Sequence, residues 1–122
     1  MVRDKSKEFG LRIIGLYKYL TRTQQEYILS KQVLRSGTSI GANIREGFAG
    51  QSKLDFLSKL YISYKEAEET AYWLELLHES DYITDAQFES IYTDNKELIR
   101  LLVSMIKTIK DRIDQEKSKK RH

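Results

Sequence analysis

The stretch Ser36-Gly-Thr-Ser-Ile-Gly-Ala-Asn-Ile-Arg-Glu-Gly-Phe48 lies inside a long helical pattern, yet it contains residues that helices usually avoid. Each of its three glycines costs roughly 1 kcal/mol relative to alanine in a helix interior. The apolar spacing of a helix nevertheless continues through the stretch, from Val33 to Phe48. The small residues would give this helix a nearly flat face: Ser36, Gly37, Ser39, Gly41 and Ala42. The stretch therefore predicts the tightest helix–helix contact of the protein, and the list of packing residues is completed by Gly47.

Two polar residues of the same stretch have a predicted structural role. Asn43 and Glu46 are three positions apart, so they lie near one another on one side of a helix. We expect them to hydrogen-bond to a neighbouring helix and so to fix the register between the two. Contact with a ligand is the alternative interpretation of the pair.

The composition indicates one helical domain. The chain has 122 residues, which suits a single domain spanning 1–122. It has no cysteine, which excludes a disulfide scaffold and a thiol enzyme, and no proline, which suits long helices. No apolar run resembles a signal peptide or approaches the roughly 20 residues of a membrane span. We therefore expect a cytoplasmic protein with no membrane partner.

Working outward from the stretch, the hydrophobic periodicity predicts four helices. They cover approximately residues 4–21, 24–48, 52–79 and 84–113. Capping boxes are predicted at Thr23 with Glu26 and at Thr84 with Gln87, and Ser52 is the predicted N-cap between them. Short connections between amphipathic helices favour an all-α, antiparallel up-and-down four-helix bundle, in which the long third and fourth helices extend past the first.

The third and fourth predicted helices carry more apolar surface than a monomeric bundle needs. Apolar residues fall outside the main apolar stripe of each helix: Phe56, Ile62, Tyr72 and Trp73 in the third, and Leu101, Val103 and Met105 in the fourth. A second apolar face favours a subunit interface, and closed cyclic symmetry is the usual form of such assemblies. The alternative is that these side chains lie half-exposed on a monomer.

The sequence shows no convincing catalytic or metal site, so we expect a protein that is not an enzyme and has no cofactor. Glu75 and His78 have the Glu-x-x-His spacing of di-iron bundles, but the other histidine is His122, at the chain end, so no second pair exists. The glutamates 66, 68 and 69 are best interpreted as a solvated acidic face. Gly37 to Gly41 lacks the Gly-Lys-Ser/Thr ending of a phosphate loop.

Charge is unevenly distributed, and this makes nucleic acid the main candidate partner. Residues 1–61 carry 11 basic and 5 acidic side chains, whereas residues 62–116 carry 6 basic and 13 acidic. The tail, residues 117–122, is basic and is either a frayed helix end or a phosphate contact. The candidate phosphate-binding residues are Arg35, Arg45, Lys53, Lys59, Lys117, Lys119, Lys120 and Arg121. Ordinary surface charge is the alternative for all of them.

Several motifs resemble those of a known family, the 23S rRNA intervening-sequence proteins, also labelled S23 ribosomal proteins. That family's pattern of Ser-Ile/Val followed by Asn-Ile-x-Glu-Gly falls here on Ser39, Ile40, Asn43, Ile44, Glu46 and Gly47. Further similarity lies in Lys53-x-x-Phe56, Leu60-Tyr-Ile62 and Lys65-Glu-Ala-Glu-Glu-Thr-Ala-Tyr-Trp-Leu74. The resemblance extends over approximately residues 5–113.

The resemblance implies an antiparallel four-helix bundle that assembles as a homopentamer. The fold is also similar to that of the accessory protein of diversity-generating retroelements, a basic pentamer that binds nucleic acid, although this chain is less basic. Two functions remain open. One is a non-enzymatic oligomer that binds structured RNA or DNA. The other is a scaffold that binds a protein partner through acidic and aromatic surfaces.

Overall fold

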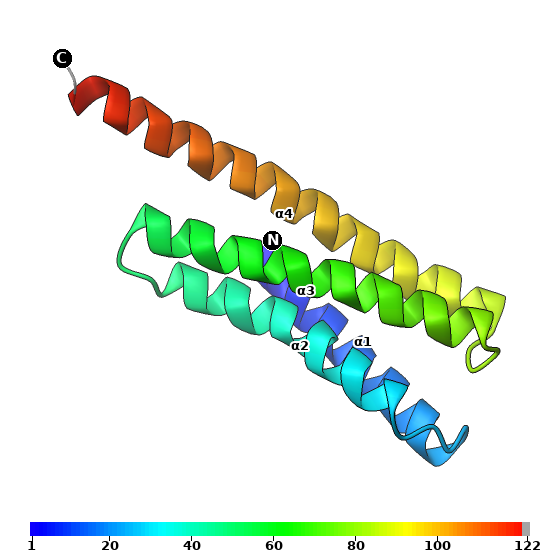
Figure 1. Ribbon diagram of the computed structural model, residues 1–122. Coiled ribbons are helices and arrows are strands. Elements are labelled where there is room, and N and C mark those ends of the chain that lie inside the picture. Colours follow the sequence, from blue (N-terminus) through cyan, green and yellow to red (C-terminus); the bar gives the residue numbers. More distant parts are fainter. Residues whose placement is uncertain (121–122) are drawn as a thin grey trace.

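The protein is a bundle of four helices. The computed structural model describes residues 1–120, which form α1 (Val2–Arg22), α2 (Leu29–Phe48), α3 (Lys53–Glu79) and α4 (Asp85–Lys120) and contain no strand. Consecutive helices run antiparallel and are joined by short connections (Figure 1). The predicted all-α fold class and four-helix bundle are therefore confirmed. Among these residues, no helix combines the length and apolar character needed to cross a membrane.

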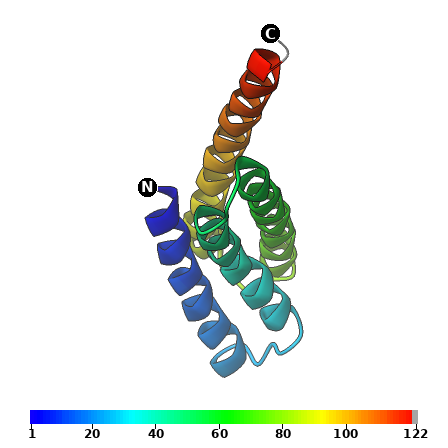
Figure 2. The same cartoon turned by 90° about the vertical axis from the view of Figure 1, so that its left-hand side faces the viewer.

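The helices pack in chain order around one core. α2 packs against α1 and α3, and α3 packs against α4, whereas α1 and α4 share a smaller contact (Figure 2). Every helix contributes apolar side chains that are almost fully buried, among them Phe9, Ile13, Leu20, Ile40, Ile44, Leu60, Leu74, Leu98 and Leu102. Burying each large side chain contributes about 1.5–3 kcal/mol, so this core is the main source of stability.

The glycines of α2 lie against two different neighbours. A Cβ atom on Gly37 would lie 2.7 Å from Cγ1 of Ile13 in α1, and one on Gly41 would lie 3.3 Å from a backbone oxygen of α1. A Cβ atom on Gly47 would lie 2.9 Å from Cδ1 of Phe56, which belongs to α3. The missing side chains therefore let α2 approach α1 along one side and α3 along another.

The prediction that the small residues of α2 form one flat face is wrong. Ala42 is exposed, and Ser36 is buried against α3, where its hydroxyl accepts a hydrogen bond from Thr70 at 2.8 Å. Ser39 donates to the carbonyl of Arg35 within α2. The small residues of α2 therefore lie on more than one of its sides, because α2 packs against both α1 and α3.

The register between helices depends on hydrogen bonds of buried polar side chains that were not predicted from the sequence. The Ser63 hydroxyl donates to the carbonyl oxygen of Ile40 at 2.9 Å, and the Asn95 amide donates to the carbonyl oxygen of Ala67 at 3.0 Å. Together with the bond between Ser36 and Thr70, these link α3 to both of its neighbours. A buried polar group without a partner costs about 1–3 kcal/mol, so a shift of either helix would be penalised.

The expected role of Asn43 and Glu46 is only partly realised. The Asn43 amide donates to the carbonyl oxygen of Ser39 within α2, so the predicted bond to a neighbouring helix is not formed. Glu46 does face α3, where its carboxylate lies 3.8 Å from the Lys59 ammonium, but this pair is exposed to solvent. Exposed pairs contribute roughly 0–1 kcal/mol, so the buried polar bonds dominate the register.

The ends of the helices differ from expectation in two places. α2 begins at Leu29 rather than near residue 24. α4 continues to Lys120 rather than ending near residue 113, so residues 117–120 are helical. The last turns of α4 extend past the beginning of α1 (Figure 1).

The residues predicted to form a second apolar face fall into two groups. Phe56, Trp73, Leu101 and Met105 are half-buried and pack against the core. Ile62, Tyr72 and Val103 remain exposed, at 39%, 54% and 50% of their surface. The excess of apolar surface is therefore smaller than the sequence suggested, but an exposed part remains on α3.

Candidate nucleic-acid interface

Charge separates along the bundle. Residues 66–97, which contain the turn between α3 and α4, carry ten acidic side chains and one basic one. Residues 98–120, the remainder of α4, carry seven basic and three acidic side chains. The turn and the end of α4 lie at opposite ends of the molecule (Figure 1). A phosphate-bearing partner would therefore be attracted to the end where α4 finishes.

At that basic end, the beginning of α3 and the end of α4 enclose a cleft of about 450 Å³. Lys53, in the first turn of α3, faces Lys117 and Lys120 from the last turns of α4. The remaining lining residues are Gln51, Ser52, Leu54, Ile113 and Glu116. The Ser52 hydroxyl accepts from the Asp55 amide at 3.0 Å, which fixes the start of α3 and hence the base of Lys53. The structure thus brings together predicted residues from the middle and from the end of the sequence.

A single carboxylate balances the lysines of this cleft. The Lys53 ammonium donates a hydrogen bond to Glu116. That bond, followed by the positive charges of Lys53, Lys120 and Lys119, holds the pKa of Glu116 below its ordinary value. Lys117 also lines the cleft, so its three lysines outnumber its one acid and leave an excess of positive charge. All five side chains are exposed, and a phosphate can reach them.

Two other predicted phosphate-binding residues are paired with acids outside the cleft. The Arg35 guanidinium lies 3.2 Å from Glu66 and is also hydrogen-bonded to Glu69, so α3 neutralises its charge. Lys59 faces Glu46, as described above. An acid on the facing helix therefore pairs with each of these two cations, from α3 for Arg35 and from α2 for Lys59.

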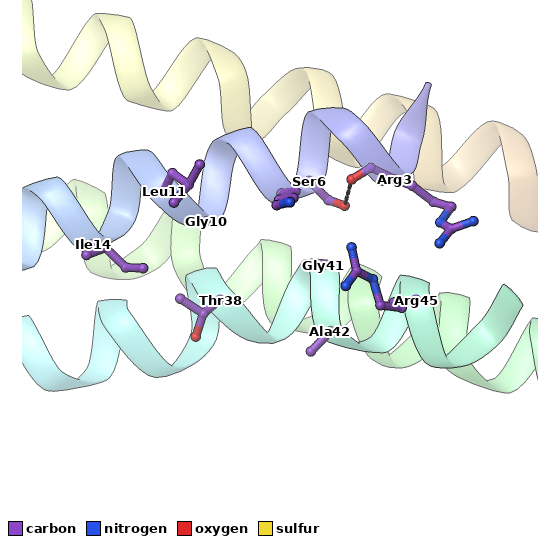
Figure 3. A pocket seen from close by; sticks show the side chains of 10 residues that line it. Arg3, Ser6, Gly10, Leu11, Ile14, Thr38, Gly41, Ala42 and Arg45 are labelled. Carbon is purple, nitrogen blue, oxygen red and sulfur yellow. Dashed lines mark hydrogen bonds between the residues drawn. The ribbon is translucent and has the colours of Figure 1, made fainter. Parts of the chain in front are cut away.

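Arg45 lies in a different place, in a groove between α1 and α2 (Figure 3). It shares the groove with Arg3 and Lys7, two cations that the sequence analysis did not select. Their spacing of four residues was visible in the sequence, but the face of α1 that meets Arg45 was not. Arg121, the last of the predicted residues, lies outside the described residues.

Glu75 and His78, the pair with metal-ligand spacing, contact other side chains in the structure. Within residues 1–120, no group of three or more His, Asp or Glu side chains could hold a metal ion. Glu75 accepts a hydrogen bond from the Tyr92 hydroxyl at 2.7 Å. His78, in the last turn of α3, lies 2.6 Å from Asp85 and stacks on Phe88. The Glu-x-x-His pair therefore has separate structural partners.

Comparison with known proteins places the chain in a family. The family model described as "23S rRNA-intervening sequence protein" matches residues 1–104. A solved structure from Bacteroides thetaiotaomicron VPI-5482, a protein with unknown function from the S23 ribosomal protein family, is 58% identical. The alignment covers 88% of this chain and 99% of that one, with a TM-score of 0.87. No curated protein matches the chain. This chain belongs to the family of 23S rRNA-intervening sequence proteins.

Proposed function

We propose that this chain is a non-enzymatic protein that binds structured RNA through the basic cleft between α3 and α4. The observation that carries the proposal is a cleft lined by three lysines, Lys53, Lys117 and Lys120, with a single carboxylate, Glu116. The family is named for sequences that interrupt 23S rRNA, which makes RNA the first nucleic acid to test.

The cleft suits phosphates for two physical reasons. Its lysines are compact charges on flexible stems, which bind phosphate without demanding one geometry. Its lysines also outnumber its one carboxylate, Glu116, so the cleft keeps a positive potential that attracts phosphate. Double-stranded RNA is recognised largely by the shape and phosphates of its helix, so a group of lysines without a base-reading element favours structured RNA over a particular sequence.

The test is a fluorescence-anisotropy titration of a labelled RNA hairpin at about 50 and 200 mM salt, using the whole protein. Replacing Lys53, Lys117 and Lys120 by alanine removes three phosphate contacts, which should reduce the slope of log K against log salt by about 2. The control replaces Lys18, Lys31 and Lys96, which lie outside the cleft, and changes the net charge equally. Equal slopes for the two triple variants would contradict the cleft assignment.

A second variant acts in the opposite direction. Glu116→Gln removes the carboxylate that competes with phosphate for the lysines, so RNA affinity should rise a few-fold at about 50 mM salt. A merely structural ion pair would instead leave RNA affinity unchanged. This variant therefore separates a phosphate site from a contact that only holds α4 against α3.

A protein-binding scaffold is the second candidate. The observation that favours it is the excess of acid in residues 66–97, which carry ten acidic side chains and one basic one. Four of these acids pair with cations of α1 and α2, namely Glu66, Glu69, Asp94 and Glu97, and the others leave a net negative charge at that end. Such a surface suits a basic protein partner. Absence of RNA binding at about 50 mM salt, together with recovery of one stoichiometric protein in a pull-down, would replace the RNA proposal by this one.

A further inference from the structure

The later part of α4 presents a line of charged side chains to solvent. Six exposed residues follow one another at intervals of three or four, which keeps them on one side of the helix. We name them the α4 stripe: Arg100, Val103, Lys107, Lys110, Asp114 and Lys117. The core-facing residues Leu102, Ile106 and Ile109 are buried and lie on a different side of α4. The stripe therefore plays no part in the packing of the bundle.

The four cations of the stripe have no acidic partner within the chain. None of them forms an ion pair with a carboxylate of residues 1–120, whereas Lys5, Arg12 and Arg35 of α1 and α2 are each paired. Asp114, the one acid of the stripe, has no ion-pair partner among these residues either. Four cations and one acid leave a positive charge that the fold does not compensate.

The part of α3 beside the stripe supplies little acid. Two contacts fix the level at which α3 lies next to α4: the Asn95 amide donates to the carbonyl oxygen of Ala67, and Lys53 pairs with Glu116. Between these levels, residues 53–67 carry three basic and two acidic side chains. Residues 68–79, toward the other end of the bundle, carry four acidic side chains and no lysine or arginine. The positive potential of the stripe is therefore not cancelled by its neighbour.

The stripe continues the basic cleft. Lys117 belongs to both, so the cations of the cleft and of the stripe form one connected surface. At about 1.5 Å per residue, Arg100 and Lys117 lie roughly 26 Å apart along the helix axis. The end of α4 projects past the other helices in both views, which leaves this surface open to a large partner (Figure 1, Figure 2).

We infer that an RNA duplex lies along the α4 stripe and reaches the basic cleft. The inference rests on the proposed function and deepens it, because it names the form of RNA that is bound and adds Arg100, Lys107 and Lys110 to the interface. A duplex carries a dense, extended array of phosphates, which suits a straight line of cations. A single strand is held largely by stacking of its bases on aromatic side chains, and the stripe contains none.

The test compares RNA hairpins that share one loop and differ in stem length. At roughly 3 Å per base pair, a stem of about 5 pairs is shorter than the stripe and a stem of about 15 pairs is longer. Replacing Arg100, Lys107 and Lys110 by alanine gives the stripe variant, which keeps every residue of the cleft. Circular dichroism verifies that each variant is folded.

The matched control replaces one arginine and two lysines on other helices. Lys18, Arg22 and Lys31 are also exposed and have no ion-pair partner among residues 1–120. They lie on α1 and α2, outside both the cleft and the stripe. The two triple variants therefore have the same net charge and differ only in where the charge was removed.

The readout is the slope of log K against log salt, measured by fluorescence anisotropy between about 50 and 200 mM. For the wild-type chain and the control, the long stem should give a slope steeper by about 2 than the short stem, because it reaches three more cations. For the stripe variant, the two stems should give equal slopes. Affinity alone does not suffice, since a long stem offers a small site more overlapping positions without adding phosphate contacts.

Equal slopes for the two stems with the wild-type chain would overturn the inference, as would a stripe variant that keeps the steeper slope. The proposed function survives either result if the short stem still binds and depends on Lys53, Lys117 and Lys120. Absence of binding to both stems at about 50 mM salt would overturn the proposed function and the inference together.

Two further measurements test the form of the RNA and the acid of the stripe. An unstructured strand with as many nucleotides as the long hairpin should bind more weakly than that hairpin; equal affinity, lost in the stripe variant, would show that a duplex is not required. Asp114→Asn should raise affinity for the long stem a few-fold at about 50 mM salt and leave the short stem unchanged. An equal rise for both stems would mean that Asp114 acts on the cleft and not through the stripe, against the inferred path of the duplex.

Discussion

Thr23 with Glu26 and Thr84 with Gln87 have the same capping-box spacing, but only the second pair forms a capping box. At the start of α4, the Thr84 amide donates to Oε1 of Gln87 at 2.8 Å, and the Gln87 amide donates to the Thr84 hydroxyl at 3.1 Å. At the start of α2, Thr23 makes no such bond. Its amide donates to the carbonyl of Tyr19, so Thr23 ends α1 rather than beginning α2.

The difference arises from what precedes each threonine. Thr84 follows a turn, whereas Thr23 directly follows the last residue of α1. Gln25 adopts a left-handed conformation with φ of 56°, and the Glu26 amide donates back to the carbonyl of Leu20, which completes the end of α1. A threonine can cap a following helix only if its backbone is not already used by the preceding one.

Glu26 supplies the cap of α2 instead, from outside the helix. Its carboxylate accepts hydrogen bonds from the backbone amides of Ile28, Leu29 and Ser30, at 2.7 to 3.1 Å. Glu26 is itself buried, with 8% of its surface exposed. One carboxylate thus satisfies three of the amides that a helix start leaves without partners. This explains why α2 begins at Leu29.

The largest effect in this comparison is expected at Glu26. Glu26→Ala removes a charged acceptor from three amides and should lower the free energy of unfolding by about 2 kcal/mol. The measurement is urea unfolding followed by circular dichroism at one fixed protein concentration. Glu8→Ala, an exposed glutamate in α1, is the control and should change stability by less than about 0.5 kcal/mol. Equal effects at the two positions would mean that Glu26 is not the cap.

The contribution of Glu26 should also depend on pH. Burial by itself raises the pKa of this carboxyl, but the hydrogen bonds from the amides of Ser30, Leu29 and Ile28 outweigh it and leave the pKa below its ordinary value of 4.5. The folded state therefore binds fewer protons than the unfolded state near that pH. The stabilisation is complete above about pH 4.5 and is lost as the pH falls through the lower, folded pKa.

Unfolding of the wild-type chain and of Glu26→Gln at several pH values tests this dependence. The stability difference between them should be constant from about pH 5.5 to 7 and should shrink below about pH 4.5. The glutamine variant is the reference because it cannot ionise, so that pH effects from all other groups cancel. A difference that grows on acidification would show that the pKa of Glu26 is raised rather than lowered.

The two helix starts illustrate what the sequence could predict. The helix count, the cap at Ser52 and the capping box at Thr84 follow from local periodicity and short motifs, because the groups involved lie within one turn of each other. The start of α2 could not be placed in this way. The amides of Thr23 and Gln24 both bond to the end of α1, and a motif search does not register that competition.

The candidate site was harder to predict, because its members are distant in sequence. Lys53 and Glu116 are 63 residues apart and meet only because α4 continues as a helix to Lys120. The positive charge of Arg35 was visible, but its neutralisation by Glu66 and Glu69 depends on the alignment of α2 with α3. Composition can indicate a basic region, whereas the three-dimensional packing decides which charges remain available.

Thr84→Ala is expected to have the intermediate effect. It removes the acceptor of the Gln87 amide and should cost about 1 kcal/mol of stability, the usual value for the loss of an N-cap. The side-chain oxygen of Gln87 in turn accepts a hydrogen bond from the Thr84 amide, and Gln87→Ala, which removes only this acceptor, should cost less than that. If the double variant is only as unstable as Thr84→Ala, the two bonds act as one unit, as the reciprocal geometry suggests.

Thr23→Ala should have the smallest effect of these substitutions, and it tests most directly whether Thr23 is the N-cap of α2. If Thr23 were the N-cap of α2, this substitution would cost about 1 kcal/mol, as at Thr84. In the structure, Thr23 is exposed and only its backbone amide is bonded, and alanine has the same amide. We therefore expect a change of less than about 0.3 kcal/mol in the free energy of unfolding, measured in urea beside Thr84→Ala. A loss comparable to that of Thr84→Ala would show that the Thr23 hydroxyl caps α2 in solution and that the two motifs of equal spacing do act alike.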